Sequence, residues 1–262
     1  MKTASQVKLS DIQAVYSGFE GKLWELIMGE QIHIGGLTSS LDLAETAGIG
    51  EGMSGVDFCC CSGAGMRFLS RFRKVASMTG VDATATQIEL GRARSAGLPH
   101  TFMVSDVCEN GLPGASADFI WGEDAWCYVA DKSKLIAEAA RIVKPGGVIA
   151  FTDWVEGSPM TDTEAARFLA FMKFPTFANL DDYKKLLEAN GCEIVAARNT
   201  ERFAPCVDLY LNMLGQQLTY DALKIVGFDN AIMEMLGGEM QNTQKLAHEG
   251  KVIQGLFVAR KK

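Results

Sequence analysis

The chain has 262 residues, of which 48% are hydrophobic and 22% charged; this is enough for one large domain and excludes an intrinsically disordered chain. The formal net charge of −7 argues against general nucleic-acid binding, because such binding requires clustered positive charge. No stretch approaches the roughly 20 apolar residues that span a bilayer, and residues 1–8 lack the apolar core of a signal peptide. We therefore expect a cytoplasmic protein without nucleic-acid or membrane partners, and the sequence leaves a homo-oligomer open.

Segments typical of strands alternate with segments typical of helices from residue 55 onwards, which predicts an α/β fold with a parallel sheet. We expect strands at 55–60, 75–81, 101–105, 117–121, 148–152, 192–197 and 252–259. Helices are expected at 64–72, 84–96, 132–143 and 180–189. A basic cluster is interpreted as the solvated face of a helix; it comprises Arg67, Arg71, Arg73 and Lys74.

Two segments lie outside this alternation and are too long and too apolar to be plain loops. Residues 1–50 are expected to be helical, and the stretch before the last strand is predicted to form helices at 205–226 and 230–249. We therefore expect a helical cover at 1–50, a core at 51–200, a helical insertion at 201–250 that completes the cover, and the last strand at 251–262.

Seven cysteines are present, and none belongs to a C-x-x-C pair, so no metal site is expected. Cys59, Cys60 and Cys61 are expected at the end of the first strand, where successive side chains point to opposite faces and cannot converge on one metal. We interpret the cysteines as buried free thiols that pack like small apolar residues.

Acidic residues follow the first three strands, at the edge of a parallel sheet where ligands bind. Asp57 precedes a turn in which Gly63 and Gly65 allow a ligand to approach the backbone, although a purely structural turn would look similar. Asp82 can accept hydrogen bonds from two ribose hydroxyls, cap the next helix, or do both. Asp106 can accept from an adenine amino group or cap a turn.

These carboxylates predict a site for an adenosine ligand that carries no pyrophosphate. The G-x-G-x-x-G pattern of dinucleotide-binding folds does not occur in the sequence. An adenosine that bears a sulfonium and an amino acid suits the acidic arrangement better. A nicotinamide-dependent oxidoreductase and a non-catalytic cofactor-binding protein are the alternatives from other classes.

Several segments resemble a known family, namely residues 15–17, 31–35, 57–72, 121–125, 140–147 and 151–153. With them the chain resembles the S-adenosylmethionine-dependent methyltransferases of the Rossmann-like type. Within that type it is similar to sarcosine/dimethylglycine and phosphoethanolamine N-methyltransferases. The resemblance implies a seven-stranded, mostly parallel sheet with an antiparallel last strand and helices on both faces. It also implies S-adenosyl-L-methionine as cofactor and S-adenosyl-L-homocysteine as product.

The resemblance further implies which residues bind the cofactor. Asp57, Gly63 and Gly65 would shape the methionine pocket, and Tyr16 and His33 would close over it from the cover. The other implied cofactor-binding residues are Cys61, Asp82 at the ribose, Ala83, Asp106 and Val107 at the adenine, and Glu123 beside the sulfonium. Cys59 and Cys61 stand where the family has glycines, and we expect them to adopt a β-type backbone.

The acceptor is expected to be a small molecule, and an amine is the first candidate. Tyr128 and His33 are the candidate catalytic residues; Tyr128 could orient a nucleophile, take a proton or merely pack. The aromatic residues expected near the acceptor are Trp121, Trp126, Tyr128 and Trp154, whose faces would attract a cation; packing between sheet and helix is the alternative for Trp121 and Trp154. Methylation of carbon by a cyclopropane-synthase-like enzyme, or of oxygen or sulfur, is the runner-up.

Overall fold

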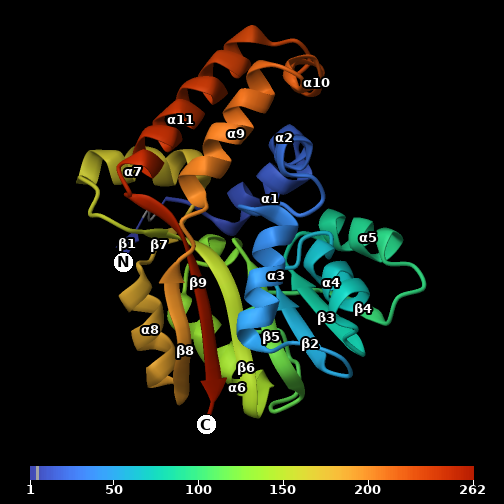
Figure 1. Cartoon of the computed structure of the whole chain (residues 1–262). Coiled ribbons are helices and arrows are strands. Elements are labelled where there is room, and N and C mark those ends of the chain that lie inside the picture. Colours follow the sequence, from blue (N-terminus) through green and yellow to red (C-terminus); the bar gives the residue numbers. More distant parts are fainter. Residues whose placement is uncertain (4–5) are drawn as a thin grey trace.

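The fold is built on a seven-stranded sheet with the order β4-β3-β2-β5-β6-β9-β8 (Figure 1). The computed structural model describes residues 1–3 and 6–262. The strands of the sheet are β2 (Ser54–Phe58), β3 (Ser77–Asp82), β4 (His100–Val104), β5 (Ala117–Glu123), β6 (Val143–Glu156), β8 (Cys192–Asn199) and β9 (Val252–Lys261). Only β9 runs antiparallel to its neighbours, β6 and β8. The expected fold class, with its antiparallel last strand, is therefore confirmed.

Successive side chains of a strand point to opposite faces of the sheet, and in the central strands the side chains on both faces are apolar. Helices therefore cover both faces. In β5, Ile120 packs into a hydrophobic core cluster that lies under α6 (Lys132–Ile142) and α8 (Leu180–Ala189). Its neighbours Phe119 and Trp121 point the other way, into the cluster with α3 (Gly36–Ala47) and α4 (Ala64–Phe68). The helix α5 (Ala85–Arg94) packs beside β3 and β4.

A layer of helices lies over the carboxyl-terminal ends of the parallel strands (Figure 1). It consists of α1 (Leu9–Ser17), α2 (Phe19–Met28), α7 (Asp162–Met172), α9 (Phe203–Gly215), α10 (Thr219–Ile225) and α11 (Asn230–His248). A short pair of strands, β1 (Lys2–Thr3) and β7 (Thr176–Phe177), closes one edge of the layer. No helix in the described part of the chain is both long and apolar enough to cross a membrane.

The cover differs from the sequence prediction in three places. Within residues 1–50, which include the undescribed residues 4–5, α3 packs on a face of the sheet rather than over its end. The expected helix at 205–226 is two helices, because the backbone turns at Gln216, where φ is −128° and ψ is −97°. The helix α7 was not foreseen, although Thr161 and Glu164 form a capping box at its start.

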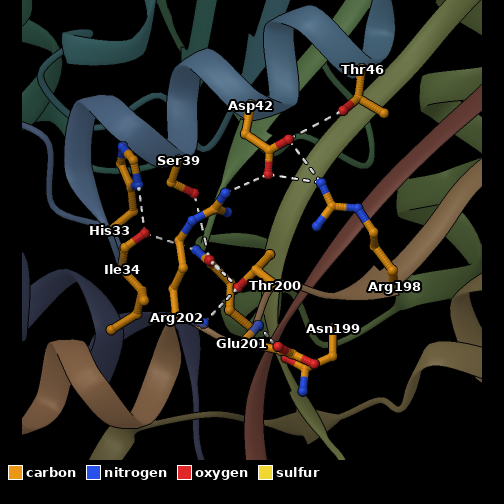
Figure 2. Close-up of polar contacts among 11 residues, drawn as sticks. His33, Ile34, Ser39, Asp42, Thr46, Arg198, Asn199, Thr200, Glu201 and Arg202 are labelled. Atoms are coloured by element: carbon orange, nitrogen blue, oxygen red, sulfur yellow. Dashed lines mark hydrogen bonds and ion pairs between the residues drawn. The ribbon is translucent and has the colours of Figure 1, made fainter.

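Two arginines, one at the end of β8 and one just before α9, pair with the same carboxylate on α3, as Figure 2 shows. Asp42 on α3 accepts from Arg198, at a distance of 2.8 Å, and from Arg202, which precedes α9. These contacts lower the pKa of the Asp42 carboxyl against the opposing effect of burial. The ion pairs therefore tie the base of the cover to the sheet.

Candidate active site

A cavity of about 310 Å³ opens where the strand order reverses, beyond the carboxyl-terminal ends of β2 to β5. Its lining brings together most of the residues expected to bind cofactor, which are Tyr16, His33, Asp57, Cys61, Gly65, Asp82, Ala83, Asp106, Val107 and Glu123, together with Tyr128. Gly63 is the exception. It lies next to the cavity, and a Cβ there would meet the Phe102 ring at 2.7 Å, so it allows close packing of the turn.

Asp57, at the end of β2, presents a buried carboxylate to the cavity. In the described part of the chain no hydrogen bond to this carboxylate is formed, so its lone pairs are available. Burial raises the pKa of Asp57 well above its ordinary value, and the nearby carboxylates Glu123 and Asp82 raise it further. A cationic group in the cavity would relieve this unfavourable charge.

Asp82, at the end of β3, combines the two roles left open by the sequence. One carboxylate oxygen accepts from the backbone N–H of Thr84 at 2.8 Å, and the other accepts from the N–H of Cys61 at 2.9 Å. Burial raises the pKa of Asp82, and these two donors oppose that rise. Because the carboxylate also lines the cavity, its remaining lone pairs can accept from a ligand.

The turn after β2 differs from expectation in its backbone. The strand ends at Phe58, so the three consecutive cysteines belong to the turn rather than to the strand. Cys59 and Cys61 have φ values of 59° and 48°, in the left-handed region, whereas we expected a β-type backbone. A non-glycine residue in that region costs about 1 kcal/mol. The thiol of Cys61 donates to the side-chain oxygen of Gln87 at 3.3 Å.

The far end of the cavity lies at the loop after β4. Asp106 is exposed and accepts from the backbone N–H of Cys108 at 2.8 Å, so it caps a turn, while Val107 is buried.

The expected solvated helix face also needs correction. Arg67 is buried, donates to the carbonyl of Ser62 at 2.6 Å and pairs with Glu30 at 2.6 Å. It therefore braces the turn beside the cavity.

His33 is held in a buried polar cluster rather than standing free. Its Nε2 lies 3.3 Å from Glu123 and 3.2 Å from the hydroxyl of Ser40, and that hydroxyl also donates to Glu123 at 2.6 Å. The side-chain amide oxygen of Gln31 lies 3.1 Å from the same hydroxyl oxygen. The cluster orients Glu123 toward the cavity. Ser40 was missed, because nothing in its helical sequence context marks it as a partner for a strand end.

Tyr16 and Tyr128 meet at the inner wall of the cavity. Their hydroxyl oxygens lie 3.1 Å apart, and their rings make an edge-to-face contact at 5.5 Å. Burial raises the pKa of both phenols above the ordinary value. Tyr128 therefore stays protonated at neutral pH and can orient a nucleophile by hydrogen bonding better than it can act as a phenolate base.

The three tryptophans expected near the acceptor do not line the main cavity. Trp121 and Trp126 are fully buried, and Trp126 stacks on Phe151 with a centroid distance of 4.0 Å. Trp154 donates through its indole N–H to Asp124 at 3.2 Å and lines only a small adjoining hollow. Packing is the alternative that the sequence offers for Trp121 and Trp154. The structure shows Trp121 and Trp126 packed in the core, and neither lines the cavity, so they form no aromatic cage there.

Two further residues position the turn that carries Tyr128. The ammonium of Lys132 is buried and donates to the carbonyl of Val129 and to the hydroxyl of Thr176. Asp153 accepts from the backbone N–H of Cys127 at 2.9 Å. The sequence did not mark Lys132, because a lysine at the start of a helix is usually solvated.

Asp124 joins the cover to the sheet directly below the cavity. It accepts from the backbone N–H of Ile34 at 2.8 Å and from the side-chain amide of Gln254 at 2.9 Å. Its bonds hold the loop that carries His33.

Among the described residues, no group of three or more His, Cys, Asp or Glu side chains is placed to hold a metal ion.

Comparisons with known proteins agree with this geometry. A family model described as a methyltransferase domain matches residues 56–151, which run from β2 into β6. Methyltransferase GfsG of Streptomyces halstedii is 26% identical over 67% of this chain and 68% of its own length. Dimethylglycine N-methyltransferase of Parasynechococcus marenigrum is 29% identical over 62% of this chain and 64% of its own length. The chain thus spans about two thirds of these relatives.

Solved structures show the same fold. Phosphoethanolamine N-methyltransferase 2 of Haemonchus contortus, in complex with phosphomonomethylethanolamine and S-adenosylhomocysteine, superimposes with a TM-score of 0.84 at 20% identity, covering 97% of this chain and 59% of that one. The cyclopropane synthase MmaA2 of Mycobacterium tuberculosis gives 0.82 at 16% identity, covering 98% and 100%.

The fold and the matched domain define an S-adenosylmethionine-dependent methyltransferase. The chain carries a methyltransferase domain, and S-adenosylmethionine is the cofactor that this domain and this fold indicate. The cavity fits that cofactor, because the unpaired carboxylate of Asp57 suits a cationic amino acid group.

Proposed function

We propose that the chain methylates a nitrogen atom of a small-molecule amine. The observation that carries the proposal is the acidic cavity at the reversal of strand order, in which Asp57 and Glu123 face the same space as the hydroxyl of Tyr128. An amine is attracted to such a site as a cation and reacts as the neutral base. Relatives that methylate amines by name, such as dimethylglycine and phosphoethanolamine N-methyltransferases, support this choice.

The chain's own residues would hold the cofactor in a fixed pose. Asp57 would accept from its amino group, Asp82 from the ribose hydroxyls, and Asp106 with the backbone of Val107 from the adenine. Gly65 allows the Glu123 carboxylate to lie against the turn, since a Cβ there would be 2.6 Å from it. When bound, S-adenosylmethionine supplies an electrophilic methyl group on a sulfonium. Tyr16 and His33 would close the site and exclude water.

Tyr128 would align the acceptor rather than deprotonate it. Methyl transfer is an in-line displacement, so most of the acceleration comes from holding the nucleophile near the methyl group in the correct direction. The raised pKa of Tyr128 keeps its hydroxyl protonated and able to bond to the acceptor. Lys132 and Asp153 hold the turn on which Tyr128 sits, so they would act as positioning residues.

A carbon or oxygen acceptor is the second candidate. It is favoured by the burial of Trp121 and Trp126 away from the cavity, because the aromatic cage that would select a methylated ammonium is then missing.

Transfer of labelled methyl from S-adenosylmethionine to panels of amines, phenols, thiols and carboxylates tests the proposal. We expect label in the amine panel, and its loss in Asp57→Ala. Label confined to the phenol panel would replace the first candidate with the second.

A further inference from the structure

The helical cover contains a second cavity of about 270 Å³, which we call the cover chamber. It lies between α2, α7, α9, α10 and α11, and its walls are formed by apolar side chains such as Leu23, Trp24, Phe171, Leu211, Leu214 and Met240. Because protein interiors are close-packed, an apolar hollow of this size is more typical of a ligand site than of a packing defect.

The cover chamber adjoins the cofactor cavity at Tyr128, which lines both. A small hollow between the two shares Tyr16, His33 and Tyr128 with the cofactor cavity, and it shares Trp24 and Met172 with the chamber. Tyr128 lines all three spaces. A molecule whose reacting atom lies beside the Tyr128 hydroxyl would therefore extend into the chamber.

The charges in the lining restrict what can occupy the chamber. No lysine or arginine belongs to its described lining, and the only ionisable or amide side chains besides Tyr128 are Glu20 and Gln241. A phosphate or carboxylate would lose its hydration there without gaining a partner, which is unfavourable. An uncharged apolar group would be stabilised there by the burial of its apolar surface.

We propose that the methyl acceptor has an apolar body that occupies the cover chamber while its methylated atom lies beside Tyr128. This inference rests on the proposed methyl transfer, and it excludes small polar metabolites as the preferred acceptor. It holds for an amine as well as for a hydroxyl or carbon acceptor, since it concerns the body of the molecule.

Two adjacent glycines on α11 offer a matched pair for the test. Gly237 lines the chamber, and a Cβ built on it meets no atom within 4 Å. Gly238 is exposed, does not line the chamber and is equally free of neighbours. Gly237→Phe should fill the chamber, whereas Gly238→Phe makes the same change in the same helix outside it.

Calorimetry with decanol, in the presence of S-adenosylhomocysteine, measures binding without requiring turnover. We expect Gly237→Phe to weaken decanol binding at least tenfold and Gly238→Phe to leave it within twofold of wild type. Both variants should bind S-adenosylhomocysteine like wild type, which verifies that they are folded. Equal decanol binding by wild type and Gly237→Phe, or no binding at all, would overturn the inference.

Methylation of decylamine and ethanolamine separates this inference from the proposed function. Preference for decylamine, lost in Gly237→Phe, supports both. Efficient methylation of ethanolamine, unaffected by Gly237→Phe and without activity on decylamine, supports N-methylation and overturns the apolar acceptor. Decanol binding that depends on the chamber, without methylation of either amine, supports an apolar acceptor and contradicts the proposal that the acceptor is an amine.

Discussion

The hydroxyls of Tyr16 and Tyr128 lie 3.1 Å apart and join the first helix of the cover to the turn after β5. The same turn separates the cofactor cavity from the cover chamber. One contact therefore links closure of the cover with the position of the side chain that we expect beside the acceptor.

Removal of the Tyr128 hydroxyl should impair turnover but not cofactor binding. We expect Tyr128→Phe to lower kcat about tenfold, which corresponds to one lost hydrogen bond in the transition state. Its Kd for S-adenosylhomocysteine should stay within twofold of wild type. Tyr16→Phe is the matched control, because it removes the same inter-tyrosine bond while leaving the Tyr128 hydroxyl, and its kcat should fall less. Wild-type turnover by Tyr128→Phe would mean that this residue only packs.

Replacement of Asp82 should weaken cofactor binding. Hydrogen bonds to a charged group are worth about 1.5–3 kcal/mol each, so Asp82→Ala should raise the Kd for S-adenosylhomocysteine at least tenfold. The variant also leaves the N–H groups of Thr84 and Cys61 without their acceptor, so a modest fall in Tm is expected. Calorimetry and thermal unfolding measure the two effects. An unchanged Kd in a folded variant would contradict the assignment of Asp82 to the ribose.

Cofactor affinity should rise with pH through the ionisation of Asp57. Burial raises the pKa of Asp57, so a larger fraction of this carboxyl is protonated in the free protein than in water. A cationic amino group binds the ionised form, so binding lowers this pKa and releases protons, and affinity falls as pH drops below the raised pKa. Titrations with S-adenosylhomocysteine between about pH 5 and 8 would measure the slope. Asp57→Asn should abolish the pH dependence of the affinity. An identical slope in that variant would mean that another group causes it.

At Cys61, whose backbone is left-handed, the glycine variant should be more stable than the alanine variant, which reverses the usual order of stability. At ordinary positions alanine is more stable than glycine by about 0.4–1 kcal/mol. With φ at 48°, Cys61→Gly should instead have a free energy of unfolding about 1 kcal/mol above that of Cys61→Ala. Urea unfolding measures the difference. The pair Cys60→Gly and Cys60→Ala is the control, since Cys60 has no positive φ, and it should keep the ordinary order.

Residues 16–36 should be ordered by the cofactor. The side-chain amide of Gln13 donates to the carbonyl of Ala83 at 2.8 Å, and that of Gln87 donates to the carbonyl of Tyr16 at 2.7 Å. Because these bonds connect the cover to the loop after β3 and to α5, S-adenosylhomocysteine should increase amide protection in residues 16–36 as well as in the loops. Hydrogen exchange measures this. Protection confined to residues 61–65, 82 and 106 would show that the cover plays no part in cofactor capture.

The sequence by itself determined the sheet and the acidic edge of the site. Apolar segments separated by helical patterns predict parallel strands, and parallel strands bring their carboxyl ends to one edge, which is why Asp57, Asp82 and Asp106 could be grouped in advance. The strand-to-helix turn was also predictable, but its backbone was not. Cys59 and Cys61 adopt left-handed angles that glycine would normally supply, and only the surrounding packing imposes them.

Tertiary structure alone decided which side chains reach the cavity. When both faces of a strand are covered, alternation cannot say which face a residue takes, so Trp121 was expected near the acceptor and is packed in the core. The bond from Ser40 to Glu123 joins positions 83 residues apart, and no local pattern encodes it. The cover chamber likewise exists only because helices distant in sequence leave an apolar space beside Tyr128, which depends on their packing and not on the periodicity of any one of them.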